Sequence, residues 1–219
     1  MKYIIGTLPI IVFLVIFIFL NRKELNKTKL LEYFFLFILG CIACYTTNKI
    51  ENKVGGYFPR MADMSALMVF IYAILGVSLY EEGFKWFFTL VMTFKEKLSK
   101  LSMITYSVIC SLGFAFSENI VYYIAYSNLH NAVSRMFTAV PGHVCFAIVM
   151  GLLLWHAMHN KGIKRWVFLF LSCFIPIILH ATYNALIYKG IVDLYLYNFI
   201  YLAILEIISI VILIKSLKE

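Results

Sequence analysis

Long apolar runs, separated by short polar stretches, constrain this chain more than any other feature of its sequence. A helix needs about 20 mostly apolar residues to cross the hydrocarbon core of a bilayer. We expect about seven such runs, at residues 3–20, 31–47, 64–94, 103–127, 133–155, 166–188 and 194–214. Because 63% of the 219 residues are hydrophobic and only 14% are charged, a water-soluble fold would lack polar surface. The sequence therefore predicts an all-α, polytopic transmembrane bundle that forms one membrane domain over residues 1–219.

The positive charges of the loops predict the orientation of the bundle, because cytoplasmic loops carry an excess of lysine and arginine. One set of alternate loops, with the C-terminal end, holds the larger group: Arg22, Lys23, Lys27, Lys29, Lys95, Lys97, Lys100, Lys161, Lys164, Arg165, Lys215 and Lys218. The opposite set holds the smaller group: Lys2, Lys49, Lys53, Arg60 and Lys189. We expect a multi-pass protein of the cell membrane with its N-terminus outside and its C-terminus in the cytoplasm. Scattered loop charges of this kind indicate contact with the lipid bilayer and no nucleic-acid partner.

Ionisable residues inside the apolar runs are the candidates for function, because a charge at mid-bilayer costs roughly 2.5–3.5 kcal/mol. The third run contains Glu81, Glu82 and Lys85. Helical spacing places Lys85 one turn from either carboxylate. A neighbouring ammonium can keep one of two adjacent carboxylates ionised as a general base. The alternative interpretation is a structural ion pair, which needs only one carboxylate.

The fourth to sixth runs each contain polar residues at a similar depth. Glu118 lies in the fourth run, His143 in the fifth, and His180 and Asn184 share one face of the sixth. Counted from the expected outer ends, the two histidines and Glu118 lie about 12–15 Å deep. The paired carboxylates of the third run lie deeper unless that long span is tilted, broken or protruding. We therefore expect one water-filled cavity lined by Glu81, Glu82, Lys85, Glu118, His143, His180 and Asn184.

Other polar residues of the apolar runs have structural interpretations. Arg135 lies near the outer edge of the fifth run, where its side chain can snorkel to the membrane surface. Glu206 stands alone in the seventh run, and we expect it to stabilise helix packing. Cys145 lies close to His143 in sequence, but residues two apart point to different helix faces. A cysteine nucleophile is therefore not expected.

Taken together, the polar motifs resemble those of a known family, the PrsW family of intramembrane proteases. This family belongs to a wider superfamily with the CAAX prenyl endopeptidases and with bacteriocin-processing or immunity relatives. The motifs are Glu81-Glu82-x-x-Lys85, Phe114-x-x-x-Glu118-Asn119, Pro141-Gly142-His143 and His180-x-x-x-Asn184. They span roughly residues 64–188, the expected catalytic core. Glu118 stands where the CAAX proteases carry a histidine, which favours PrsW-like chemistry. The resemblance implies cleavage of membrane-tethered regulators, such as anti-sigma factors, near their extracytoplasmic face.

The expected chemistry is the attack of an activated water on a peptide carbonyl of a single-span membrane protein or peptide. Glu81 is the expected general base, with Glu82 as the alternative or supporting carboxylate. Lys85 would tune and position this pair. His180 and Asn184 would stabilise the oxyanion, because donors aimed at developing charge in a dry site contribute several kcal/mol.

The sequence leaves the cofactor and two rival functions open. Glu118 and His143 would complete the pocket as an acid, as water-holding groups or as ligands. Catalysis is either metal-free or dependent on zinc. The candidate zinc ligands are Glu81, Glu118, His143 and His180. The rivals are a transporter or proton-relay protein, which would show flux driven by a pH gradient, and a non-catalytic immunity or partner-binding relative. The second rival would lead one to expect the loss of a motif residue, and none is lost.

Overall fold

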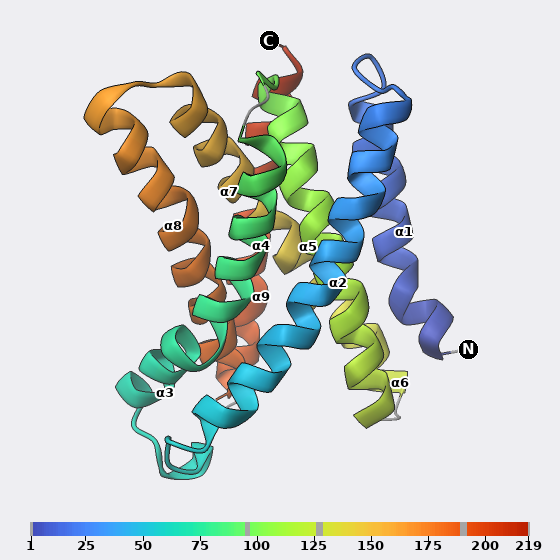
Figure 1. Cartoon of the computed structure of the whole chain (residues 1–219). Coiled ribbons are helices and arrows are strands. Elements are labelled where there is room, and N and C mark those ends of the chain that lie inside the picture. Colours follow the sequence, from blue (N-terminus) through green and yellow to red (C-terminus); the bar gives the residue numbers. More distant parts are fainter. Residues whose placement is uncertain (1, 95–96, 126–128, 189–191, 219) are drawn as a thin grey trace.

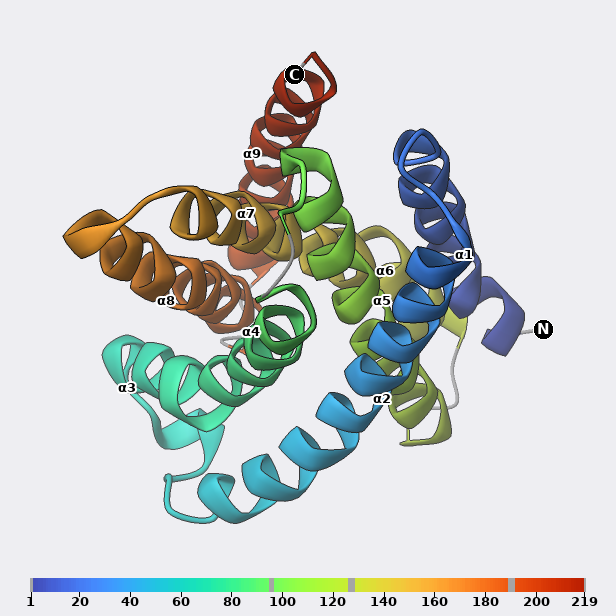
Figure 2. The ribbon, with the colours of Figure 1, turned by 45° about the horizontal axis from the view of Figure 1, so that its top comes forward.

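The computed structural model describes residues 2–94, 97–125, 129–188 and 192–218, and shows a bundle of helices that cross at oblique angles (Figures 1 and 2). The α-helices are α1 (Lys2–Leu20), α2 (Lys27–Gly55), α3 (Ala66–Tyr72), α4 (Leu79–Thr93), α5 (Lys100–Ala125), α6 (Leu129–Phe137), α7 (Ala139–His159), α8 (Gly162–Tyr188) and α9 (Val192–Leu217). A 3₁₀ turn, η1 (Met61–Asp63), precedes α3, and a π-helical segment, η2 (Ala73–Ser78), joins α3 to α4. The described ranges contain no strand, so the predicted helical fold class is confirmed.

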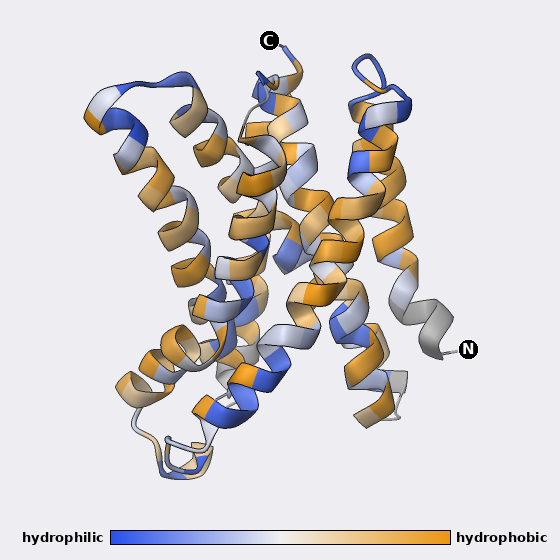
Figure 3. Ribbon diagram, viewed as in Figure 1, coloured by the Kyte–Doolittle hydropathy of each residue, from blue (hydrophilic) through white to orange (hydrophobic). Residues whose placement is uncertain are grey.

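Six helical stretches are long and apolar enough to cross a membrane. They are Lys27–Gly55, Ala66–Thr93, Lys100–Ala125, Ala132–His159, Gly162–Tyr188 and Leu196–Leu217. The N-terminal helix contributes a shorter apolar stretch, Thr7–Leu20. Figure 3 shows hydrophobic colour along much of the helix shafts and hydrophilic colour gathered at the ends of the bundle. The chain is thus a helical membrane bundle, and a seventh crossing by α1 stays a prediction.

Parts of the charge comparison fall on positions that the structure does not describe. Lys95 and Lys189 lie outside the described residues, as does the side chain of Lys2. Ser127, where we expected the fourth span to end, also lies outside them. The orientation of the termini therefore stays a prediction.

Helix α2 extends further than the sequence predicted. The Asn26 side chain accepts a hydrogen bond from the backbone N–H of Lys29 at 2.8 Å, which caps the first turn. The helix then runs without a break to Gly55, although we expected a loop from residue 48 onward. One face of the last two turns of α2, with Asn48 and Glu51, consequently lines the cavity described below.

The long third span is continuous but irregular. It comprises α3, the π-helical segment η2 and α4, which follow one another without a break in the helix, so the irregularity is the π-helical segment. A π turn inserts an extra residue and changes the direction in which later side chains point, and such segments are frequent at functional sites. This segment ends at Ser78, one turn before the paired glutamates of α4.

The fifth span is interrupted between α6 and α7. Thr138 leaves the helical conformation, with φ −123° and ψ −64°, three residues before Pro141. A proline has no backbone N–H, so the carbonyl four residues earlier, that of Phe137, loses its helical donor. The interruption thus lies just before the Pro-Gly pair, and His143 lies in the second turn of α7.

Glycines allow three helices to pack closely in the middle of the bundle. A Cβ atom on Gly40 of α2 would lie 2.1 Å from the carbonyl oxygen of Cys110 in α5. One on Gly113 of α5 would lie 2.0 Å from the carbonyl oxygen of Phe37, and one on Gly151 of α7 would meet the α5 backbone at 2.6 Å. Small residues are what membrane helices use for such close contact. Beyond this crossing α2 and α5 diverge (Figure 1).

Candidate active site

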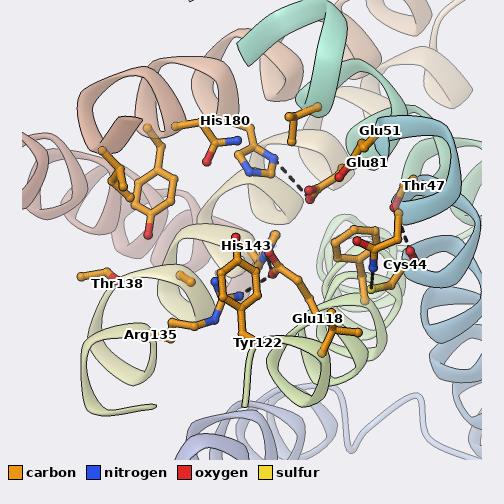
Figure 4. A pocket seen from close by; sticks show the side chains of 18 of the residues that line it. Cys44, Thr47, Glu51, Glu81, Glu118, Tyr122, Arg135, Thr138, His143 and His180 are labelled. Atoms are coloured by element: carbon orange, nitrogen blue, oxygen red, sulfur yellow. Dashed lines mark hydrogen bonds and ion pairs between the residues drawn. The ribbon is translucent and has the colours of Figure 1, made fainter. Parts of the chain in front are cut away.

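A cavity of about 610 Å³ lies where the helices diverge, with walls from α2, α4, α5, α6, α7 and α8 (Figure 4). Five of the seven expected site residues line it: Glu81, Glu118, His143, His180 and Asn184. Glu82 and Lys85 lie directly behind its wall, each with 1% of its surface exposed. All seven side chains therefore lie in or beside one pocket.

Glu82 is held between two cationic or hydrogen-bonding partners. The Lys85 ammonium donates to Glu82 Oε1 at 2.5 Å, and His180 Nδ1 lies 2.8 Å from the same oxygen. Because a carboxylate only accepts, His180 carries its proton on Nδ1 when it makes this bond. The contacts join α4 to α8 and compensate the charge of Glu82.

Glu81 has a different environment, although it is the next residue along the chain. Its Oε2 atom lies 4.0 Å from Lys85 Nζ and 3.9 Å from His180 Nδ1, which are too long for hydrogen bonds. This oxygen is buried and has no hydrogen-bond partner among the described residues. Glu81 also lines the cavity, whereas Glu82 does not. Of the two carboxylates, only Glu81 therefore offers a free oxygen from the cavity wall.

A continuous chain of polar contacts extends from Lys85 across the bundle. Lys85 Nζ lies 3.2 Å from His143 Nδ1, and an ammonium can only donate, so His143 accepts on Nδ1. Its proton is then on Nε2, which lies 2.9 Å from Glu118 Oε2. Glu118 also accepts from Arg135 Nη2 at 2.6 Å. The chain links α4, α7, α5 and α6.

The snorkelling interpretation of Arg135 was wrong. The Arg135 side chain points into the bundle, and only 14% of it is exposed. Its Nε atom donates to Asn119 Oδ1 at 2.7 Å, and its guanidinium lies 3.9 Å from the ring centre of Tyr122. The interruption before α7 gives α6 its own direction, and this places Arg135 beside Glu118 (Figure 4). The adjacent acceptors of Glu118 and Asn119 were the sequence signal for a partner with several donors, such as the guanidinium of an arginine.

His180 and Asn184 lie one turn apart on α8 and both face the cavity. The His180 ring stacks on Phe146, with 5.1 Å between ring centres, and meets the His143 ring edge-on at 5.3 Å. Asn184 is 8% exposed and shares no hydrogen bond with any described residue. Its amide is therefore available to a ligand in the cavity.

Glu51 is a cavity residue that sequence reasoning missed. It lies in the last two turns of α2, which we expected to be loop, and it lines the cavity with Cys44 and Thr47. Its Oε1 atom is buried and has no hydrogen-bond partner among the described residues. The absence of glycine and proline between Cys41 and Val54 was the signal that the helix continues past residue 47.

Four buried residues have ligand atoms close enough together to be compared with the ligand set of a metal ion. Ligand atoms of Glu81, Glu82, His143 and His180 lie within 4.8 Å of one another. Carboxylate oxygens and imidazole nitrogens are zinc ligands. The Oε2 atoms of both glutamates are buried without hydrogen bonds among the described residues. The chemistry of these residues thus fits a zinc ion, which would share the carboxylates with the Lys85 ammonium.

This group differs in one member from the ligand set expected from the sequence. It contains Glu82, where the sequence suggested Glu118. Glu118 is occupied instead by Arg135 and His143. The difference follows from Arg135, whose inward position the sequence did not reveal.

Comparison with known proteins decides the family. The profile described as PrsW family intramembrane metalloprotease matches residues 29–212, a range that contains all the expected site residues. The chain belongs to this family. It is similar to Protease PrsW of Halalkalibacterium halodurans, with 36% identity over 165 residues that cover 65% of this chain and 75% of that protein. Protease PrsW of Clostridioides difficile is 30% identical over 189 residues, which cover 83% of this chain and 77% of the relative. No solved structure matches this chain.

Membership of the PrsW family confirms the resemblance read from the motifs. The chain is a multi-pass intramembrane protease, and its substrate is a membrane protein.

Proposed function

We propose that the chain cleaves a membrane-tethered protein, such as an anti-sigma factor, near its extracytoplasmic side, with Glu81 as the general base. The observation that carries this proposal is the unequal environment of the two adjacent glutamates. Glu82 is bonded to Lys85 and His180 through Oε1, and its unpaired Oε2 lies behind the wall, whereas Glu81 presents its unpaired Oε2 from the cavity wall. A base must have a free lone pair beside the water that it activates.

In the proposed reaction, Glu81 removes a proton from a water molecule while the water oxygen attacks the peptide carbonyl carbon. The protonated Glu81 then returns this proton to the leaving amine as the C–N bond breaks, which restores the carboxylate. The cavity of about 610 Å³, lined by several polar side chains, has room for the water and for a peptide group. The Asn184 amide, which has no partner among the described residues, would donate to the oxyanion.

His180 acts in this scheme through its protonation state. With its Nδ1 proton bonded to Glu82, a neutral His180 has no proton on Nε2 to give to an oxyanion. It donates to the oxyanion when it is an imidazolium, and the Glu82 carboxylate stabilises that cation. Glu82 is then a supporting carboxylate rather than the base.

Lys85, His143 and Glu118 hold the site in place. The Lys85 ammonium compensates Glu82 and fixes which nitrogen of His143 carries the proton. Glu118, which is bonded to Arg135, accepts a hydrogen bond from the protonated Nε2 of His143 and so keeps the His143 ring in the cavity wall. These groups position the reacting residues without touching the scissile bond.

Zinc dependence has its own test. The residues that would hold a zinc ion are Glu81, Glu82, His143 and His180, and a bound ion would activate the attacking water as a Lewis acid. If the enzyme uses zinc, a chelator abolishes cleavage and added zinc restores it. Metal content measured on the purified protein gives an independent readout, and Glu81→Gln with His180→Ala should then lower it.

The contacts of Arg135 favour hydrolysis over a proton relay. The polar chain from Lys85 through His143 to Glu118 resembles a relay in its composition, but it ends on Arg135. A guanidinium does not release its proton in a protein, so the chain has no outlet there. The arrangement instead suits a fixed electrostatic frame around the cavity.

The proposed side of cleavage depends on the orientation of the bundle. The cavity lies toward the end of the bundle that carries α3 and α6 (Figure 1). The distribution of loop charges predicts that this end faces outward and that the C-terminus lies in the cytoplasm. Reporter fusions at residue 219 test this, and a C-terminus found outside would contradict both the orientation and the side of cleavage.

The decisive experiment is co-expression of the chain with candidate single-span membrane proteins, scored for their cleavage. Glu81→Gln retains the size of the side chain and removes the base, so cleavage should fall by roughly 10²–10⁴-fold. Glu206→Gln is the matched control in α9, which should change expression or stability more than turnover. Cleavage that survives Glu81→Gln combined with Glu82→Gln would exclude both carboxylates from the chemistry.

A further inference from the structure

A second cavity, of about 790 Å³, lies beside the proposed active site between α6, α8 and α9. Its walls are mostly apolar, with Val133 and Phe137 from α6 and Phe199 from α9. Phe137 and Phe199 are 60% and 57% exposed, so each ring has a face available to an occupant. We call this space the α6–α9 groove.

The α6–α9 groove adjoins the cavity that contains Glu81. Three residues line both spaces: Ser134 and Thr138 at the end of α6, and Ile187 in the last turn of α8. The groove and the proposed catalytic cavity are therefore neighbours that share part of one wall. Thr138 is also the residue at which the fifth span is interrupted, so the irregular backbone lies between the two spaces.

One polar group in the groove lacks a partner. Asn198 is only 4% exposed and lines the groove, yet its Oδ1 atom shares no hydrogen bond with any described residue. A buried amide oxygen without a donor is unfavourable by a few kcal/mol. Lipid tails, which fill other apolar surfaces of a membrane protein, offer no donor. The oxygen therefore favours an occupant that carries an N–H group into an apolar space.

We propose that the α6–α9 groove binds an unwound, apolar segment of the membrane substrate beside the scissile bond, a role that rests on the proposed function. A regular transmembrane helix has its backbone N–H groups paired internally. An unwound segment has free N–H groups, and one of them donates to Asn198 Oδ1. Its apolar side chains pack on Phe137 and Phe199, and the chain continues past Thr138 to Glu81.

Photo-crosslinking tests this assignment without requiring cleavage. The photoreactive residue p-benzoylphenylalanine replaces Phe137 or Phe199 in Glu81→Gln protein held in lipid nanodiscs. Phe170, which is 62% exposed on α8 and lies outside the groove, is the matched control. The probe is a synthetic single-span Leu/Ala peptide with a Gly-Gly pair that unwinds one end, and a second version lacks that pair.

We expect peptide adducts at positions 137 and 199 well above those at 170, and more of them with the Gly-Gly peptide. Asn198→Leu keeps the volume and removes the acceptor, so the yield should fall about two- to tenfold, as for loss of one hydrogen bond. Equal yields at all three positions, adducts with lipid alone, or no preference for the unwound peptide would overturn the assignment. The comparison of positions uses native Asn198, so it remains decisive if Asn198→Leu does not fold.

Failure of the groove and failure of the proposed function give different results. If the protein with native Glu81 cleaves the peptide but no peptide is captured at positions 137 and 199, the groove does not bind the substrate and the protease mechanism still stands. Capture at both positions without any cleavage supports the groove and contradicts the proposed mechanism at Glu81.

Discussion

Helices α2 and α5 are packed as tightly as backbones allow at one level of the bundle, and lie apart at another. At the crossing, the Cβ positions of Gly40 and Gly113 fall about 2 Å from carbonyl oxygens of the opposite helix. Toward the end that carries α3 and α6 the same helices diverge, and Glu51 of α2 and Glu118 of α5 face each other across a cavity (Figures 1 and 4). The oblique crossing that the glycines permit is what separates the helices further along.

The two levels depend on different interactions. The crossing is held by contact between apolar surfaces and backbones, since Leu36 and Ile109 beside it are buried in one hydrophobic cluster. The cavity level is held by charged pairs, such as Glu82 with Lys85 and Glu118 with Arg135. Substitutions at the crossing should therefore change stability, whereas those at the cavity should change activity, or change both where a buried charge loses its partner.

The largest effect is expected for Lys85→Met, which should lower both stability and activity. The substitution removes the ammonium that donates to Glu82 at 2.5 Å and leaves a buried carboxylate with His180 as its hydrogen-bond partner. Breaking a buried ion pair typically destabilises a protein by about 3–5 kcal/mol. Unfolding in detergent, followed by circular dichroism, should therefore show a large loss of stability together with loss of cleavage.

The double variant Lys85→Met/Glu82→Gln is the control for that result. With both charges removed, most of the lost stability should return, while cleavage should stay low because His180 loses its carboxylate. A double variant that is as unstable as Lys85→Met would mean that Lys85 stabilises the fold through contacts other than its pair with Glu82, such as those with His143 and the Phe114 ring.

Asn184→Ala should affect activity without affecting the fold. Loss of one oxyanion donor typically lowers the rate by about 10²–10³-fold. Asn48→Ala is a matched control, because Asn48 lines the same cavity from α2. Cleavage rates are measured for both variants, with capture of the peptide in parallel. Binding of the peptide should persist in both variants. Equal losses of cleavage rate would contradict a special role for Asn184.

The contrast between the two levels also explains which features the sequence predicted. Glu118, His143 and His180 stand out because ionisable residues inside apolar runs are rare, and their positions within the runs placed them at similar depths. The spans themselves followed from their length and hydropathy. Both signals are local, so they can be read without knowing how the helices pack.

Features that arise from packing between helices were not accessible in this way. Arg135 lies near the end of an apolar run, where snorkelling is the usual outcome, and only the break at Thr138 turns it toward Glu118. Glu51 follows a polar stretch that resembles a loop, and only the unbroken course of α2 brings it into the cavity. Helical spacing lets Lys85 reach either carboxylate, so only the contacts of Lys85 in the structure distinguish Glu81 from Glu82.

Gly113→Ala tests the crossing. Its new Cβ would lie 2.0 Å from the Phe37 carbonyl oxygen, so α2 and α5 must move apart. Overpacking of this kind typically costs about 1–3 kcal/mol. Gly83→Ala is the control next to the site, because nothing lies within 4 Å of its Cβ position. We expect a lower midpoint of thermal unfolding for Gly113→Ala alone, and equal losses in both would show that helix crossing is not the cause.

The smallest effect is expected for Glu51→Gln, and it separates a base from a carboxylate that only lines the cavity. Glu51 and Glu81 both line the same space with a buried oxygen that has no hydrogen-bond partner among the described residues. Only Glu81 lies beside Lys85 and His180, within 4.0 Å of each, where the charge that develops in the reaction can be compensated. Glu51→Gln should therefore change the cleavage rate less than about threefold, which corresponds to under about 0.7 kcal/mol. A loss as large as that of Glu81→Gln would mean that an unpaired oxygen does not identify the base, and that the reaction takes place nearer to α2.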